Sequence, residues 1–466
     1  MMMKEKRKIR CRRSVTALLM GLALGFPAHA QQSGPQSAPQ SGPQSTQEPA
    51  APGLENWLGP LAAFWTWSPE VFTRETRTAN FRWMEQNTAA RAAPLQGEIF
   101  GKPVIEAVVR FQDDTPHTFV ASYYNRGDVR EELSEADFQN LVRELSTTIS
   151  RRVRRQPMPG NQSSRQSSVR DDSLVWQLET HRFELAYAYT PPRRDGGRNL
   201  PFRAEYVRLT VSKFRPGDIP AHANTRVNVY EIRQNIQRNP ENGDVWIAQV
   251  PMVDQGPKGY CAAATAERTM RYFGQSVDQH QIAQIADTTA EGGTSFDDFK
   301  SALQAIARQY QYSFNTHIDW NFRDFQRLVD DYNRTARQTG QPEINLPAGG
   351  VIQINQIYAA FHAETLVAAR QRRRADFNRF EERIRRYVDG GAPLIWGVML
   401  GVIPEQGNPQ ASGGHLRLII GYNAQTREVL FSDSWGRGHE LKRMPIDQAF
   451  AITTSLYSLE PRGLRL

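Results

Sequence analysis

The chain has 466 residues, enough for two or three domains, and 39% of them are hydrophobic and 10% aromatic, as in a folded protein rather than a disordered one. The formal net charge is +8, but the first thirty positions hold seven basic residues and one acidic residue, so the rest of the chain is near +2. The basic charge therefore gives no support to nucleic-acid binding.

The first thirty residues have the pattern of a secretory signal. A basic segment is followed by an apolar run over 15–26 and then by the small residues of Ala28-His29-Ala30. This predicts a signal peptide over 1–30 and export to the periplasm or the medium. No later stretch approaches the roughly 18 to 20 apolar residues that a spanning helix needs, so we expect no membrane span.

Cysteine is scarce in this chain. The sequence has two cysteines, Cys11 within the predicted signal and Cys261. After removal of the signal no intramolecular disulfide is possible, although exported proteins usually pair their cysteines. A lone thiol in such a compartment is either buried and inert or kept for its reactivity.

Composition and periodicity divide the rest of the chain into a tether and two α+β domains. The helix of the first domain opens with Ser134 and Asp137 at capping-box spacing, and alternating runs on both sides of it indicate strands. The predicted boundaries are a disordered Gln/Ser/Pro-rich tether over 31–53, an N-terminal α+β domain over 54–216, a polar linker over 217–245 and a second α+β domain over 246–466.

The sequence around Cys261 predicts the first turn of a helix. Ala263, Ala266 and Met270 share one helical face, and Gly274 suits a left-handed C-cap. A loop over 256–259, Gly-Pro-Lys-Gly, precedes the cysteine. The positive end of the helix macrodipole favours a thiolate, so we expect a lowered pKa for this thiol.

Two further residues complete a candidate nucleophilic site. His415 follows two glycines at the start of an apolar, β-branched strand, and Asp433 ends a second strand eighteen residues later. An imidazole serves as general base and acid for a thiol, and a carboxylate fixes its tautomer. A metal site would need three or four ligands in close spacing, which one cysteine and scattered histidines do not supply, so we expect no metal and no cofactor.

These motifs resemble a known family. Gln255 six residues before Cys261, a Gly-His strand ending in Gly-Tyr, and Asp433-Ser-Trp-Gly have the order and spacing of the papain-like cysteine peptidases over roughly 246–460. The resemblance implies a papain-like fold in which Gln255 helps to form the oxyanion hole and Trp435 shields the His415–Asp433 contact. Tyr-Cys-Ala-Ala, the absence of a disulfide, Asp433, and Gly-Gly-Thr-Ser over 292–295 before an expected helix look more like the bacterial branch that includes the double-glycine leader peptidases.

The function implied is an exported cysteine peptidase that acts on peptide or protein substrates. The alternatives are an acyltransferase or amidase that uses the same thioester, and a catalytically silent binding protein on the same scaffold. Residues 54–216 are expected to be either a pro-region or a binding module. Residues 315–374, which include Arg370, are expected to form a solvated helical insertion. Cleavage specificity and oligomeric state stay open.

Overall fold

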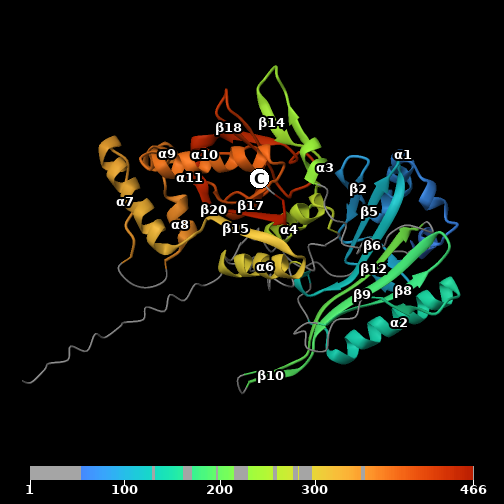
Figure 1. Ribbon diagram of the computed structural model, residues 1–466. Helices are drawn as coiled ribbons and strands as arrows, with labels where there is room; N and C mark the ends of the chain where they lie inside the picture. Colours follow the sequence, from blue (N-terminus) through green and yellow to red (C-terminus); the bar gives the residue numbers. More distant parts are fainter. Residues whose placement is uncertain are drawn as a thin grey trace, which may run out of the picture.

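The computed structural model has two antiparallel sheets, each with its own hydrophobic core. One core is built from residues within 54–211 and the other from residues within 232–459. Figure 1 shows the two sheets side by side, the first in blue to green and the second in yellow-green to red. The structure describes residues 54–128, 132–160, 170–195, 198–214, 229–255, 260–275, 282, 296–347 and 352–464.

The N-terminal sheet has eight strands in the order β1-β2-β5-β6-β12-β9-β8-β7. Its strands are β1 (Arg82–Glu85), β2 (Ala89–Ala92), β5 (Glu106–Gln112), β6 (Thr115–Asn125), β7 (Met158–Pro159), β8 (Arg170–Gln177), β9 (His181–Thr190) and β12 (Arg203–Lys213). The short pairs β3 (Glu98–Ile99) with β4 (Lys102–Pro103), and β10 (Arg193–Asp195) with β11 (Arg198–Leu200), lie outside it.

Helix α2 (Glu135–Val153) packs on the N-terminal sheet, with Phe138, Leu145 and Ile149 buried. The predicted cap is confirmed, because Ser134 accepts a hydrogen bond from the backbone amide of Asp137. The aromatic-rich segment before the sheet is divided among the short helices η1 (Leu54–Leu58), η2 (Ala63–Thr66) and α1 (Pro69–Glu75). Pro60 and Pro69 account for these breaks, since proline starts helices but does not continue them. Two further short helices are η3 (Arg77–Ala79) and η4 (Arg126–Asp128).

The C-terminal sheet has the order β13-β14-β17-β16-β20-β15, with β18 on β17 and β19 on β18. Its strands are β13 (Ile236–Arg238), β14 (Asp244–Ile247), β15 (Tyr312–Ile318), β16 (Leu394–Leu400), β17 (Gly413–Asn423), β18 (Glu428–Ser432), β19 (Lys442–Pro445) and β20 (Thr453–Pro461). The strands predicted to follow His415 and to precede Asp433 are confirmed as β17 and β18.

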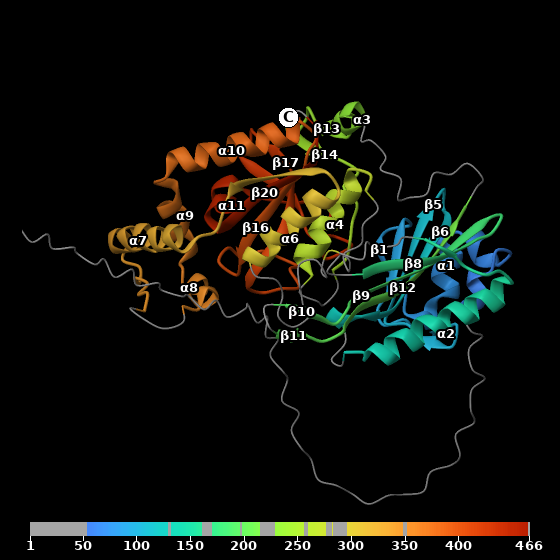
Figure 2. The same cartoon turned by 60° about the horizontal axis from the view of Figure 1, so that its bottom comes forward.

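Helices cover both faces of the C-terminal sheet. In Figure 1, α4 (Cys261–Tyr272) and α6 (Phe296–Gln309) lie on one face, and α9 (Ala363–Gln371), α10 (Arg374–Asp389) and α11 (Ile446–Ile452) on the other. The remaining helices are α3 (Val229–Gln234), α7 (Phe322–Thr339) and α8 (Ile354–Ala359). Figures 1 and 2 both show α4 at the side that faces the N-terminal sheet.

Two segments differ from the sequence interpretation. Part of the predicted linker is folded, because β13 and β14 join the C-terminal sheet and Asp244 accepts a hydrogen bond from Asn423 in β17. The predicted solvated insertion begins with the end of β15, a strand paired with β20, and its Arg370 is largely buried against Phe450. The polar sequences of both segments do not indicate these strands, because the pairing of a strand with distant residues is not visible in local periodicity.

The predicted signal and tether over 1–53 lie outside the described residues, and the domain boundaries stay a prediction. Among the residues that the structure describes, no helix combines the length and apolar character needed to cross a bilayer. Nor does that part of the chain contain a cluster of three or more His, Cys, Asp or Glu able to hold a metal ion.

Candidate active site

Cys261 is the first residue of α4, as the sequence predicts. The helix forms from small residues, and the backbone amide of Ala264 donates to the carbonyl oxygen of Tyr260 at 2.8 Å. Thr265 on the same helix donates to the backbone oxygen of Leu416, at 3.2 Å, so α4 is tied to the strand that carries His415. The Gly-Pro-Lys-Gly loop and the expected Gly-Gly-Thr-Ser segment over 292–295 lie outside the described residues.

His415 and Asp433 form a buried pair. Strands β17 and β18 are antiparallel neighbours with Leu418 opposite Ser432, and this register brings the end of β18 beside the start of β17. His415 Nε2 lies 3.0 Å from Asp433 Oδ1, and neither side chain is exposed to solvent. His415 Nδ1 is also buried and makes no hydrogen bond with any described residue. The carboxylate thus orients the ring and leaves the second nitrogen for other chemistry.

Trp435, to which the resemblance gives a shielding role, stacks on His415. Its ring lies parallel to the imidazole of His415, with centroids 4.1 Å apart and planes at 8°. His439 contacts the other side of the indole edge-on at 5.5 Å. A flat aromatic ring on an imidazole keeps water from the His415–Asp433 hydrogen bond, which strengthens it.

Gln255 is buried next to the same loop. Its backbone amide donates to the carbonyl oxygen of Ser434 at 2.8 Å, and Ser434 Oγ donates to Gln255 Oε1 at 2.7 Å. Because the hydroxyl occupies the carbonyl end of the side-chain amide, the opposite end is Nε2, a donor. A donor at this point suits an oxyanion hole.

Two buried arginines support Asp433, and the sequence analysis did not single out either of them. Arg417 Nε lies 2.9 Å from Asp433 Oδ1, and Arg417 also pairs with Glu405. Arg268 donates to the backbone oxygens of Pro251, Ser432 and Asp433. A visible signal for Arg417 was its position two residues after His415 in an otherwise apolar strand, which puts both side chains on one face.

The electrostatics of the carboxylate follow from these neighbours. Burial alone acts to raise the pKa of Asp433, but the charge of Arg417, the hydrogen bond from His415 and the charge of Lys442 together lower it to about 2. The carboxylate is therefore ionised at neutral pH, which is the state that holds His415 by a charge-assisted hydrogen bond.

The pKa of the Cys261 thiol differs from the lowered pKa that the sequence predicts. Burial raises the pKa of Cys261, and this outweighs the lowering by backbone groups of Leu416, Ala262 and Cys261 itself. Burial likewise lowers the pKa of His415, against the opposing effect of Asp433. The helix terminus therefore lowers the pKa of the thiol by less than burial raises it. The resting pair is a neutral thiol and a neutral imidazole.

The structure therefore brings His415, Asp433, Trp435 and Gln255 together, with Cys261 beside the backbone of Leu416. No hydrogen bond between Cys261 and His415 is formed within the described part of the chain. Such contacts are often long before substrate binds. The arrangement supplies a nucleophile, a base with a fixed tautomer and an oxyanion donor, which is the equipment of acyl transfer.

The model of the Peptidase_C39 like family matches residues 332–456, a region that contains His415, Asp433 and Trp435 and begins after Gln255 and Cys261. No curated protein matches the chain.

Among solved structures, the chain is similar to xylellain, a cysteine protease from Xylella fastidiosa. The identity is 14%, the match covers 50% of this chain and 88% of that one, and the TM-score is 0.26. That TM-score is too low for an argument about the fold. The family match supports a cysteine peptidase fold for the C-terminal sheet, and the double-glycine branch stays a prediction.

The neutral resting pair has a consequence for thiol reactivity. Because the pKa of Cys261 is raised, the thiolate fraction at a given pH is lower than in a free cysteine, whose pKa is about 8.5. The rate of alkylation by iodoacetamide, followed by mass spectrometry from about pH 5 to 10, should rise with its midpoint above that value. A rate that is already at its plateau below about pH 7 would instead reveal a resting thiolate–imidazolium pair.

Proposed function

We propose that this chain is an exported cysteine peptidase that hydrolyses peptide bonds through a thioester on Cys261. The observation that carries the proposal is the buried pair of His415 and Asp433, whose side chains lie 3.0 Å apart. The next residue of the strand, Leu416, accepts a hydrogen bond from Thr265, which lies one turn after Cys261 on α4. The match of residues 332–456 to a cysteine peptidase family is consistent with it.

In the proposed mechanism, His415 Nδ1 takes the proton of the Cys261 thiol as the sulfur attacks the peptide carbonyl carbon. The tetrahedral intermediate then collapses, the C–N bond breaks, and the imidazolium gives its proton to the leaving amine. A water molecule, deprotonated by the same nitrogen, attacks the thioester and releases the acid and the thiol. Asp433 stays ionised throughout and stabilises the imidazolium.

Gln255 has the role of an oxyanion donor in this proposal. The hydrogen bond from Ser434 orients its amide so that Nε2 is the donor end. Together with the backbone amide of Cys261 at the start of α4, it would bind the oxygen that becomes negative in the transition state.

Two alternatives use the same site. An acyltransferase or amidase would form the same thioester and differ only in the acceptor or in the bond cleaved. A binding protein on this scaffold would keep the residues without turnover. The presence of a thiol, a base, a carboxylate and a side-chain amide donor favours a working enzyme over a silent scaffold, and the acceptor of the acyl group distinguishes hydrolysis from acyl transfer.

Export and a periplasmic or secreted location rest on residues 1–30 and are part of the proposal. N-terminal sequencing of the exported form tests them together with the fate of residues 54–216. A start near residue 31 supports the signal peptide, whereas a start within 217–245 would identify residues 54–216 as a pro-region.

Contacts between the two sheets favour a third role for residues 54–216, that of a brace for the active site. Asn125 at the end of β6 donates to the hydroxyl of the fully buried Tyr260, at 3.3 Å, next to Cys261. Arg91 in β2, itself buried, donates to the backbone oxygen of Asp254, next to Gln255. Both contacts thus reach residues adjacent to the proposed machinery.

A third tie reaches α4 itself, where Arg110 in β5 forms an ion pair with the buried Glu267 at 3.3 Å. The same carboxylate also pairs with Arg271 on α4, at 3.3 Å, so Arg110 adds a second cation that links α4 to the N-terminal sheet. The mature enzyme is therefore proposed to retain residues 54–216 as a working part.

The brace is tested by Tyr260→Phe, which removes only the hydroxyl that Asn125 contacts. We expect kcat to fall by a factor of roughly three to ten with little change in KM, since one buried hydrogen bond contributes about 0.5–1.5 kcal/mol to positioning. The matched control is Tyr272→Phe at the far end of α4, whose hydroxyl contacts Gly391 instead. Equal kcat values for the two variants would contradict the brace.

The peptidase activity itself is tested with the purified exported form and a mixed library of peptides, with cleavage products identified by mass spectrometry. Cys261→Ala should abolish cleavage, and Asp433→Asn should lower kcat by roughly a hundredfold or more, because it loses the charge that stabilises the imidazolium. His362→Ala, at the start of α9, is the control and should keep full activity. Cleavage that survives in Cys261→Ala would refute the proposal.

A further inference from the structure

A cavity lies in the C-terminal half of the molecule, and its lining differs from the residues of the proposed active site. Its volume is about 480 Å³, within the range of about 300 to 1,000 Å³ typical of small-molecule sites. The lining comes from the end of β15, from α7, α8, α9, α10 and α11, and from the start of β20. None of Cys261, His415, Asp433 or Gln255 is part of it.

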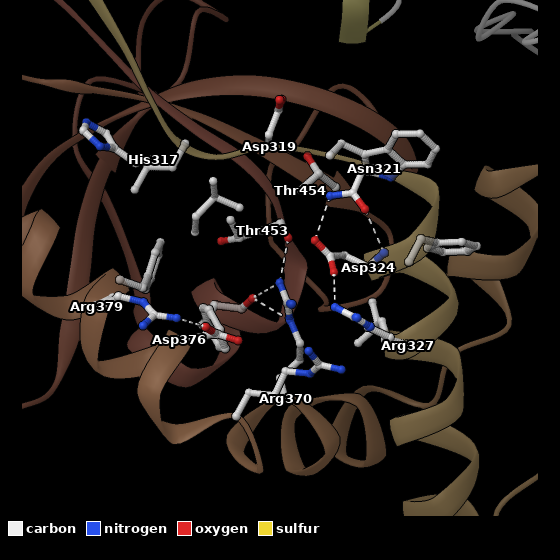
Figure 3. Close-up of a pocket in the computed structure, with 18 of the residues that line it drawn as sticks. His317, Asp319, Asn321, Asp324, Arg327, Arg370, Asp376, Arg379, Thr453 and Thr454 are labelled. Atoms are coloured by element: carbon white, nitrogen blue, oxygen red, sulfur yellow. Dashed lines mark hydrogen bonds and ion pairs between the residues drawn. The ribbon is translucent and has the colours of Figure 1, made fainter.

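The lining is strongly basic. It includes five arginines, no lysine and three aspartates: Arg327, Arg370, Arg373, Arg379, Arg383, Asp319, Asp324 and Asp376. Figure 3 shows Arg370, Arg327 and Arg379 arranged around the same space, with Asp324 and Asp376 next to the last two. Arginine presents a planar fork of donors that matches the oxygens of phosphate and carboxylate groups.

Most of these charges are neutralised within the described chain. Arg327 pairs with Asp324 at 3.1 Å, Arg379 pairs with Asp376, and Arg373 pairs at 2.8 Å with Asp331, which is not part of the lining. The remaining lining carboxylate, Asp319, pairs with Lys300.

Two arginines of the lining have no carboxylate partner among the described residues. Arg370 donates from Nε and Nη2 to the backbone oxygens of Phe450 and Thr453, and Arg383 donates to His317 Nδ1. That imidazole is neutral, since burial and the charges of Arg383 and Arg386 lower the pKa of His317 to about 4. Arg370 and Arg383 are therefore the lining cations with no ion pair in the described part of the chain, and the charges of Asp376 and Asp324 also act on Arg370.

A buried hydroxyl lies at the same wall. Thr454 at the start of β20 lines the cavity and is 5% exposed, yet its Oγ1 makes no hydrogen bond with any described residue. Figure 3 shows Thr454 across the cavity from Arg370. A buried hydroxyl without a partner costs free energy unless a ligand or water satisfies it.

We propose that this cavity binds a small molecule through an oxyanion group, a phosphate or a carboxylate, held by Arg383 and by the free Nη1 side of Arg370. The shared chemistry is a compact anion whose oxygens accept from guanidinium groups, and the cavity has room for a larger molecule that carries it. The site is independent of the thioester chemistry and is not lined by any residue of the proposed mechanism.

Binding is measured by isothermal titration calorimetry with pyrophosphate and with succinate, at constant ionic strength, on the full chain carrying Cys261→Ala. We expect one pyrophosphate per chain with a dissociation constant below about 1 mM. Arg383→Gln should weaken binding at least about tenfold. The matched control is Arg385→Gln on the same helix, which removes the same charge from an exposed pair with Glu381 outside the cavity.

The titrations distinguish a phosphate-bearing ligand from a carboxylate-bearing one, and they also show whether the cavity binds an anion at all. Tighter binding of pyrophosphate assigns a phosphate-bearing ligand, and tighter binding of succinate assigns a carboxylate. If Arg383→Gln does not fold, Arg383→Lys takes its place, since it keeps the charge but loses the planar fork of donors, and circular dichroism of each variant monitors folding. No heat from either anion up to about 10 mM, or equal weakening by Arg383→Gln and Arg385→Gln, would overturn the site.

Discussion

The carboxylate of Asp433 is the interaction on which the rest of the site depends. A fully buried charge has a high desolvation cost and persists only with charged or hydrogen-bonded partners. Here His415 and Arg417 both approach Oδ1, at 3.0 and 2.9 Å, and Arg268 binds the backbone oxygen of the same residue. The carboxylate thus joins His415 and Arg417 of β17 to the end of β18, and Arg268 joins α4 to the backbone at the same point.

This constraint also explains why the sulfur and the imidazole are neutral at rest. The dry environment that strengthens the His415–Asp433 hydrogen bond also penalises a thiolate and an imidazolium. The proposed reaction therefore needs the proton to move to His415 as the substrate is attacked, and the ionised Asp433 stabilises the imidazolium at that moment. The stacking of Trp435 on the imidazole and the charge of Arg417 beside the carboxylate favour this order of events.

The sequence predicted the parts of the site that depend on local patterns. Helix α4 with Cys261 at its start, strand β17 after His415 and the end of β18 before Asp433 follow from periodicity and are all present. The parts that it missed are non-local. Asn125 and Tyr260 are 135 residues apart, and no local pattern reports their contact. The predicted direction of the pKa shift of Cys261 was wrong. Burial has a larger effect on this pKa than the helix terminus, and burial depends on tertiary structure.

The central claim is that the sulfur of Cys261 carries the acyl group of a substrate, and intact-protein mass spectrometry tests it most directly. The protein is mixed with an activated peptide ester, quenched in acid within seconds, and digested to locate any adduct. The account predicts a mass gain equal to the acyl half of the substrate on the peptide that contains Cys261, released by hydroxylamine and absent from Cys261→Ala. Turnover of the ester with no adduct on Cys261, or with the adduct elsewhere, would contradict it.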